Sequence, residues 1–595
     1  MLNNEVNLRT SAEICSQIGS YFQIVDNCIA VADTNRAYVV NPQTSYSPSP
    51  PIASGSYTSV IISPNTHNTA DIYNGFIRAD LQFKPVINKK IADSLIRTID
   101  GEQYKFNRIW FGFKDSRDAI EKYELVANGQ SIYTQNYGCE ESFLTACCAN
   151  ETTKRADIYS KARHKDIWDN KCGCRCGIVV RWPQNQLDLR DNGNDGWVTI
   201  NLKIDLRRFL PLSNIKYLPA FAGKLELRLY FSCAAMLYCP VGPSQKLRSN
   251  PYHMNQFVLN DITNEFTPIG EEITMWCYNG KFSKIVVGDG TLKYPAETAA
   301  RNGIEGQTND PTPSPSPTPS PDTPTAGEII PIGKTVWLPE KNEKAIGCDY
   351  RKFTVSDYRV SECSSIIPCF GILDNVYNAL VQRYSSHPLT FPTQTMSFYT
   401  TTKALKNIDD KATITITPRF VDSIFCLFPL HHTHHTYFKN PLFTKFQLNC
   451  GNYGNMPAKA FGTTGEYPEF LEYCQNAMNV NGEQTGFNKE VIASLINTKQ
   501  YGMDTIGNYS DDRTSFFMGF ATETDGTYQQ GLTSLAPINF EIIVSQKTGN
   551  TDFAHEVDTP PLLCLLYDSN ISILVKPNGV PPSVAIGTYD ITTPD

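Results

Sequence analysis

The sequence predicts an all-β protein built from two antiparallel β-sandwiches in tandem. Three observations indicate this fold class: apolar and polar residues alternate in many short segments, aromatic residues are frequent (30 Tyr and 31 Phe), and one Pro-rich spacer divides two similar halves. Alternation places one face of a strand in a core, and aromatic residues favour such half-buried surfaces. A chain of 595 residues also exceeds a single core, so at least two large domains are expected.

The composition is that of a folded protein without an overall basic field. Hydrophobic residues make up 41% of the chain, charged residues make up 19%, and the formal net charge is −8. Lys and Arg are scattered, which argues against nucleic-acid binding by the molecule as a whole. The sequence is still compatible with a basic face on one part of the surface. Eighteen Cys in this length fall below the density of a disulfide scaffold.

The first residues of the chain lack a basic segment followed by an apolar core, so no signal peptide is expected. No run of eighteen uncharged apolar residues occurs, so no membrane span is expected. With free thiols, these features predict synthesis in a reducing cytoplasm, without secretion. The sequons at Asn150, Asn508 and Asn570 are accordingly interpreted as chance.

The first half is divided into an extended N-terminal arm, residues 1–70, and a first sandwich, residues 71–309. The arm contains a polar Ser/Pro/Thr tract, which either stays mobile or is ordered by a neighbour. Strands are predicted where alternation is clearest, at Gly75–Pro85, Trp197–Leu206 and Leu225–Phe231. A Cys-rich insertion at residues 138–176 interrupts them.

The second half begins after a Pro-rich segment, residues 310–345. Proline at nearly every second position from Asp310 to Thr325 favours an extended, solvated spacer, which marks either a domain boundary or a long exposed loop. Residues 346–595 are predicted to form the second sandwich. A helical insertion is expected at about 465–505, because apolar residues there recur at helical spacing.

The second sandwich is organised around the stretch Lys411–Ala460. Residues 412–416 alternate and predict a half-buried strand. Val421–Leu430 is apolar almost throughout, so both faces of a strand there must be covered, in an inner layer or at a subunit contact. Phe443–Leu448 alternates again and ends in a turn rich in Gly and Asn.

Two clusters could bind a metal. Cys172, Cys174 and Cys176, with Cys147 and Cys148 upstream, could bind zinc as thiolates, but the C-x-x-C spacing that positions two sulfurs on one ion is absent. Free thiols in an irregular insertion are the favoured interpretation.

The second cluster consists of four imidazoles, His431, His432, His434 and His435. On a strand, His431 and His435 share one face and His432 and His434 share the other, so each pair could chelate an ion. No carboxylate lies in the run to orient a ring, so a polar strand end or loop is favoured. No nucleophile elbow, phosphate-binding loop, dinucleotide fingerprint or zinc-protease motif occurs. No catalytic, cofactor-binding or metal-binding residue is therefore assigned, and the protein is expected not to be an enzyme.

In the second half, an ordered series of segments resembles the double jelly-roll major capsid proteins of Polinton (Maverick) elements, polinton-like viruses and virophages. The segments are Arg351–Cys363, Ser386–Thr401, Val421–Leu430, Asn440–Ala460, Phe516–Val544 and Leu562–Pro581. The first half matches more loosely, mainly in WVTINLKIDLRRFL (Trp197–Leu210) and LELRLYF (Leu225–Phe231). The Pro-rich spacer and the Cys-rich insertion depart from the family pattern.

The resemblance implies two tandem eight-stranded antiparallel jelly rolls, a double jelly roll, with loop and short helical insertions. It further implies a virion capsid protein that forms homotrimers, pseudo-hexameric capsomers and an icosahedral shell. The shell encloses double-stranded DNA without binding it specifically, and penton and minor capsid proteins are the expected partners. The alternative is a carbohydrate-binding or adhesin-type multi-domain β-sandwich protein, because jelly rolls also serve lectins and enzymes.

Overall fold

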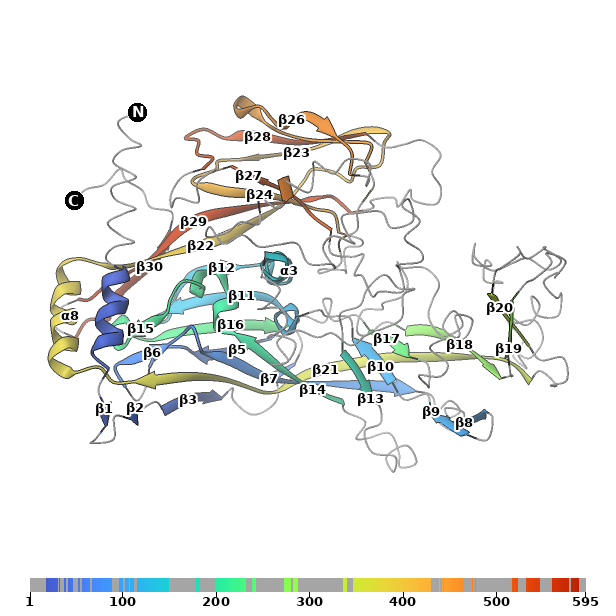
Figure 1. The fold of residues 1–595 in the computed structure, drawn as a ribbon, viewed down its shortest axis with the longest axis horizontal. Coiled ribbons are helices and arrows are strands. Elements are labelled where there is room, and N and C mark those ends of the chain that lie inside the picture. Colours follow the sequence, from blue (N-terminus) through green and yellow to red (C-terminus); the bar gives the residue numbers. More distant parts are fainter. Residues whose placement is uncertain are drawn as a thin grey trace.

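A computed structural model of the chain describes the residues that form its folded body. They are residues 18–29, 31–32, 37–38, 41–46, 52–53, 56–64, 67–87, 96–99, 102–105, 108–111, 115–148, 178–181, 198–231, 238–241, 272–279, 282–286, 335–339, 346–429, 438, 441, 443–463, 473–474, 477, 516–522, 531–545, 559–576 and 579–587. Two β-sandwiches lie side by side, with most strands running along the long axis of the molecule (Figure 1).

The first sandwich consists of two antiparallel sheets. In one sheet, β21 pairs along one side with β7, which in turn pairs with β14, and along its other side with β3 and β4. The second sheet has the order β5-β16-β11-β12. Their bounds are β3 (Asn41–Tyr46), β4 (Ile52–Ala53), β5 (Tyr57–Ile61), β7 (Phe76–Ile87), β11 (Ile120–Ala127), β12 (Gln130–Gln135), β14 (Val198–Asp205), β16 (Leu225–Phe231) and β21 (Ile346–Phe370). Successive strands switch between the sheets in jelly-roll order.

Smaller elements surround this framework. They are β1 (Val31–Ala32), β2 (Ala37–Tyr38), β6 (Thr69–Asp71), β8 (Ile96–Ile99), β9 (Glu102–Lys105), β10 (Arg108–Phe111), β13 (Ile178–Arg181), β15 (Tyr217–Pro219), β17 (Tyr238–Val241), β18 (Glu272–Asn279), β19 (Phe282–Val286) and β20 (Thr335–Pro339), with short 3₁₀ turns η1 (Ser116–Ala119), η2 (Leu206–Arg208), η3 (Leu210–Leu212) and η4 (Ala220–Ala222). Several of these strands lie together beyond one end of the sandwiches, far from α8 (Asp374–Ser386) (Figure 1).

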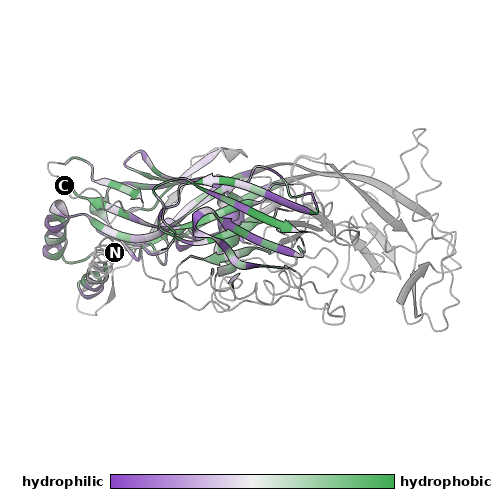
Figure 2. Cartoon of the chain, turned by 90° about the horizontal axis from the view of Figure 1, so that it is seen from above, coloured by the Kyte–Doolittle hydropathy of each residue, from purple (hydrophilic) through white to green (hydrophobic). Residues whose placement is uncertain are grey.

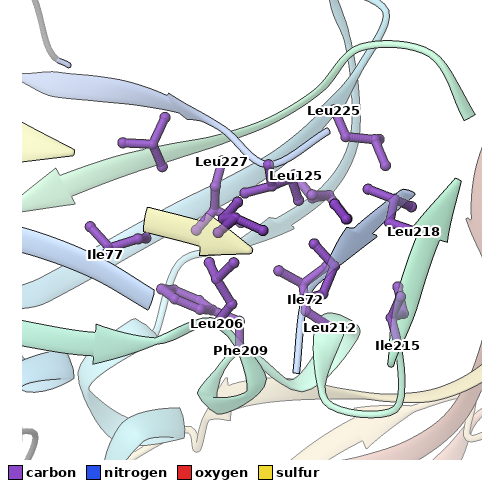
Figure 3. Packing of buried hydrophobic residues seen from close by; sticks show 14 of the residues in the cluster. Ile72, Ile77, Leu125, Leu206, Phe209, Leu212, Ile215, Leu218, Leu225 and Leu227 are labelled. Atoms are coloured by element: carbon purple, nitrogen blue, oxygen red, sulfur yellow. The ribbon is translucent and has the colours of Figure 1, made fainter. Parts of the chain in front are cut away.

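The core of the first sandwich fills the space between its sheets. Leu125 and Leu227 come from one sheet, and Ile77 comes from the other (Figure 3). Strand β16 shows how the sequence directs this packing, because its residues alternate between buried and half-buried along LELRLYF. Each inward residue removes apolar surface from water, which stabilises the fold by roughly 25 cal/mol per Å².

The second sandwich is also built from two antiparallel sheets, and its strand order is that of a jelly roll. One sheet runs β22-β29-β24-β27, with β30 also paired to β29, and the other runs β23-β28-β25-β26. The bounds are β22 (Leu389–Thr400), β23 (Asp409–Ile416), β24 (Val421–Leu427), β25 (Lys445–Cys450), β26 (Asn455–Phe461), β27 (Met518–Ala521), β28 (Ile538–Ser545), β29 (Leu562–Leu574) and β30 (Ser583–Gly587), with η6 (Gly451–Tyr453) between β25 and β26. The all-β double jelly-roll fold class is therefore confirmed.

The strand pairing divides the chain differently from the sequence-based boundaries. Strands β3 to β5 lie in the segment assigned to the N-terminal arm, and β21 lies in the segment assigned to the second sandwich, yet all belong to the first sandwich. The Pro-rich tract lies outside the described residues. Its flanking strands β19 and β20 pair with each other, and β21 follows them. Alternation reports which residues face a core, but it carries no information about which distant strand is the partner.

Strand β24 also revises one interpretation. All seven of its residues are buried within the single chain, and Phe425, Phe428 and Phe438 belong to the core of the second sandwich. The covered-strand prediction is confirmed for Val421–Leu427. Of the two explanations offered for it, burial in an inner layer applies, and a contact with another subunit is not needed to cover this strand.

Three helical segments position the sandwiches. The helix at residues 18–27 and α8 lie at one end (Figure 1), and α3 (Gly138–Cys148) lies between the sandwiches. Hydropathy colouring shows apolar residues along the strands and many hydrophilic residues on α8 (Figure 2). Of the predicted helical insertion at 465–505, only residues 473–474 and 477 are described, and they are helical. No helix among the described residues is long and apolar enough to cross a membrane.

Gly531 allows a tight backbone contact that a larger residue would break. Its φ is +92°, and a Cβ atom placed on it would lie 2.0 Å from the carbonyl oxygen of Val421. Gly129 has a similar φ of +87°, but nothing lies within 4 Å of its Cβ position.

We therefore expect Gly129→Ala to lower the free energy of unfolding by about 1–2 kcal/mol from backbone strain alone, and Gly531→Ala to lower it clearly more. Urea unfolding of both variants measures this difference, and equal losses would contradict the steric argument.

Candidate functional site

The two sandwiches meet where β12, the last strand of one sheet, lies beside β22, the last strand of another. Gln135 Nε2 donates to the carbonyl oxygen of Met396 at 2.9 Å, and the Tyr133 hydroxyl donates to the same oxygen at 3.4 Å. Thr393 Oγ1 donates to the carbonyls of Leu210 and Pro211 at 2.9 and 3.0 Å. Side chains thus cover an edge that could otherwise pair with foreign strands. We call this contact the joint.

Apolar side chains cross the joint in both directions. Phe143, Leu144 and Cys147 of α3 pack into the core of the second sandwich, where the ring centroids of Phe143 and Phe438 lie 4.5 Å apart. In the other direction, the core cluster of the first sandwich includes residues at the ends of two strands of the second. These are Leu389 and Phe391 of β22 and Ile571 and Ile573 of β29. Neither sandwich can complete its core without residues from the other.

A buried ion pair between Arg117 and Glu141 lies at the centre of the joint. Their side chains are 1% and 0% exposed, and Arg117 Nη2 donates to Glu141 Oε1 at 2.8 Å. The Glu141 carboxylate also accepts from the Tyr123 hydroxyl at 3.0 Å and from Gln135 Nε2 at 2.8 Å. Since Gln135 also donates to Met396, one side chain links the buried charge to the second sandwich.

The charge of Arg117 is retained despite its complete burial. Burial alone would lower the pKa of Arg117, but the charge of Glu141, with Tyr123 and Asp115, outweighs it and raises the pKa above its ordinary value. The guanidinium Cζ also lies 4.7 Å from the centroid of the Phe209 ring and 5.3 Å from that of Tyr123. Both charges are thus paired and enclosed, which is the condition for tolerating ions in a protein interior.

A second set of polar contacts fixes η1 against α3. Asp115 caps η1 by accepting from the Arg117 backbone N–H, and Asp118 accepts from the Asp115 backbone N–H in return. Ser142 Oγ donates to Asp118 Oδ1 at 2.7 Å, and Arg208 pairs with Asp115. Because these contacts hold both η1 and α3, they position Arg117 and Glu141 opposite each other.

The helix at residues 18–27 closes one end of the joint. The Tyr21 ring lies 6.0 Å from Phe391 of the second sandwich, and the Phe22 ring lies 6.0 Å from Tyr217 of the first. Asp26 accepts from the Tyr217 hydroxyl at 2.5 Å and from Lys216 Nζ at 2.9 Å. A segment that the sequence assigned to an extended arm therefore contacts both sandwiches.

Of these joint residues, Cys147 was singled out from the sequence, as a candidate zinc ligand, and neither member of the buried ion pair was identified. Arg117 and Glu141 are 24 positions apart, and no local pattern connects them. One signal was available for α3: Glu140 and Glu141 lie in its first turn, where acidic residues favour a helix start. The high Cys content of that region led instead to an irregular insertion.

The metal candidates remain predictions. Cys172, Cys174, Cys176 and the run His431–His435 lie outside the described residues. Cys147 is described and lies buried in α3. Within the part of the chain that the structure covers, no group of three or more His, Cys, Asp or Glu side chains could hold a metal ion.

The comparisons with known proteins give structural likenesses. No family model and no curated protein matches the sequence. Solved structures match along most of the chain. The cryo-EM structure of the Sputnik virophage has a TM-score of 0.42 at 9% identity and covers 94% of this chain and 92% of that chain. The mavirus major capsid protein has a TM-score of 0.41 at 8% identity, with coverage of 96% and 95%.

The Faustovirus major capsid protein is a third match, with a TM-score of 0.41 at 7% identity and coverage of 97% of this chain and 99% of that chain. The chain is thus similar to double jelly-roll viral major capsid proteins, the group that its sequence resembles. At these TM-scores and identities, the fold assignment rests on the strand pairing described above.

Removing the positive partner of the buried ion pair tests the importance of the joint. Arg117→Met leaves the Glu141 carboxylate buried without its counter-ion, and such a change costs about 3–5 kcal/mol. Arg228→Met is the matched control, because Arg228 lies 3.7 Å from Glu124 on a partly exposed surface, where an ion pair contributes about 1 kcal/mol or less. Urea unfolding of both variants measures the costs. Similar small losses would show that the buried pair is dispensable.

The contact between Asp26 and the first sandwich should weaken in acid. Burial alone would raise the pKa of Asp26, but hydrogen bonds from Tyr217 and Lys216 outweigh it and lower the pKa below its ordinary value. A lowered pKa means that the ionised form stabilises the docked helix above about pH 4, and that this stabilisation is lost as the pH falls through the folded-state pKa.

Hydrogen-exchange protection of residues 18–27 measures this dependence. At pH 7 we expect Asp26→Asn to lower the protection, and the parent and the variant should converge once the pH has fallen below the folded-state pKa of Asp26, which lies below its ordinary value. Asp374→Asn, an exposed change at the start of α8, is the control and should leave the protection unchanged. Equal protection of the parent and Asp26→Asn at pH 7 would exclude the proposed role of the carboxylate.

Proposed function

We propose that this chain is the major capsid protein of a virus or virus-like element. Three copies associate around a threefold axis into a pseudo-hexameric capsomer, and capsomers tile an icosahedral shell around double-stranded DNA. The protein acts as a structural component of the virion and performs no catalysis. Penton and minor capsid proteins are its partners in the shell, and the host cytoplasm is the site of its synthesis.

The observation that carries this proposal is the joint. Two jelly rolls lie side by side and exchange core residues such as Phe143 and Phe391, so one chain presents two similar units at a fixed spacing. Three such chains present six units, which suits a lattice position with six neighbours. Within a trimer each contact joins two different surfaces and closes after three copies.

The charge supports enclosure of DNA over specific binding. The formal net charge is −8, and a strongly basic surface is the usual requirement for neutralising phosphates. A stable trimer would bury roughly 2,000 to 5,000 Å² at each interface. Since β24 is already covered within one chain, the interface must use other surfaces.

The mass in solution tests the proposal. The chain has a mass of 66.6 kDa, so a trimer has a mass three times as large. We expect sedimentation velocity to show this species or larger shells, and electron microscopy to show particles with threefold symmetry. A chain that stays monomeric at micromolar concentration and binds glycans on an array would contradict the capsid function and favour the adhesin alternative.

A further inference from the structure

The helix at residues 18–27 covers one end of the joint with an apolar face. Ile18, Tyr21 and Val25 are 7%, 1% and 0% exposed, and residues three and four positions apart lie on one side of a helix. The helix lies beside α8 (Figure 1), and the Tyr21 ring contacts Phe391 of the second sandwich. Burial of apolar surface therefore favours the docked position of the helix.

Two buried hydroxyl groups oppose this docking. The hydroxyls of Tyr21 and Tyr384 are enclosed and have no hydrogen-bond partner within the part of the chain that the structure describes. The two rings lie 6.3 Å apart between centroids, in an edge-to-face arrangement. A buried tyrosine hydroxyl normally has a partner, and enclosing one without a partner costs the hydrogen bonds that it makes with water. The Tyr21 hydroxyl regains those bonds when the helix leaves the joint.

Backbone contacts hold the chain directly after the helix. The carbonyl of Cys28 accepts from the Leu373 N–H at 3.1 Å, and Ile29 forms an antiparallel bridge with Ile372. Neither contact involves the buried face of the helix. The chain can therefore remain attached at Cys28 and Ile29 while the helix before them moves.

The contact made by Asp26 is the polar clasp that closes the helix onto the first sandwich. Its carboxylate accepts from the Tyr217 hydroxyl and from Lys216 Nζ, and the Lys216 and Asp26 side chains are 42% and 43% exposed. An ion pair exposed to this extent contributes little to stability. The Tyr217 hydroxyl thus has a partner in the docked state, whereas the Tyr21 hydroxyl has none among the described residues.

We propose that the helix at residues 18–27 is a latch, which opens about Cys28 while both sandwiches stay folded. The buried pair of Arg117 and Glu141 holds the centre of the joint without the helix. Opening of the latch uncovers the Phe391 ring at the end of the joint. Segments that open in this way have an opening free energy below that of global unfolding. The latch is a property of the single folded chain and does not depend on the capsid function.

Removal of single hydroxyl groups tests the latch. Tyr21→Phe and Tyr384→Phe keep the rings and remove the hydroxyls without partners, so we expect each to raise the hydrogen-exchange protection of residues 18–27 about threefold to tenfold. Tyr217→Phe is the matched control, because it removes the same atom from a hydroxyl that donates to Asp26. This variant should lower the protection by a similar factor.

Comparison with a core strand separates opening of the latch from global unfolding. In the parent chain we expect the protection of residues 18–27 to be at least about a hundredfold lower than that of β16, whose inward side chains lie in the first core. Equal protection of the helix and β16 would show that the helix leaves only when the chain unfolds. Unchanged or lower protection in Tyr21→Phe would show that this hydroxyl does not oppose docking. Either result overturns the proposal.

Discussion

The structure depends on keeping one buried charge, Glu141, paired. Its carboxylate receives donors from η1, β11 and β12, through Arg117, Tyr123 and Gln135. An uncompensated charge in a protein interior is far more costly than any single hydrogen bond is favourable. Therefore η1, β11 and β12 must all be folded for the charge to be compensated, and α3 must position Glu141 next to them. Because Gln135 and α3 also contact the second sandwich, the same requirement fixes the position of one sandwich against the other.

This coupling explains why the chain contains two jelly rolls that behave as one unit. Inter-domain contacts that are small and polar permit relative motion, but here the cores share side chains. Phe143 lies in the second core and Phe391 lies in the first, so separation would expose apolar surface on both sides. The helix at residues 18–27 adds Tyr21 against Phe391 at one end. A fixed spacing between the two jelly rolls follows from these contacts.

The sequence predicted strands whose burial pattern is visible locally, and it did not predict contacts between residues that lie far apart in the chain. Leu225–Phe231 and Val421–Leu427 were identified correctly because burial of alternate or of all side chains is visible within seven residues. The assignment of β21 to the second sandwich differed from the pairing because its partners, β3, β4 and β7, lie hundreds of positions earlier. The Arg117–Glu141 pair could not be predicted for the same reason: the approach of the two residues depends on η1 and α3, and the Cys content of α3 concealed its helix.

Two edge strands of the second sandwich carry features that discourage pairing with foreign strands. The joint covers β22 with side chains of β12, and the other sheet of the second sandwich ends at β26, which carries Pro457 and an exposed Lys459. Proline removes a ladder donor, and an exposed lysine discourages pairing with a foreign strand. Edge pairing has no natural end, since each added strand offers a new edge, whereas contacts between other surfaces form a closed ring when the rotation between copies permits closure. Two sheet edges of the second sandwich are therefore protected against pairing with foreign strands, which disfavours open, edge-to-edge association.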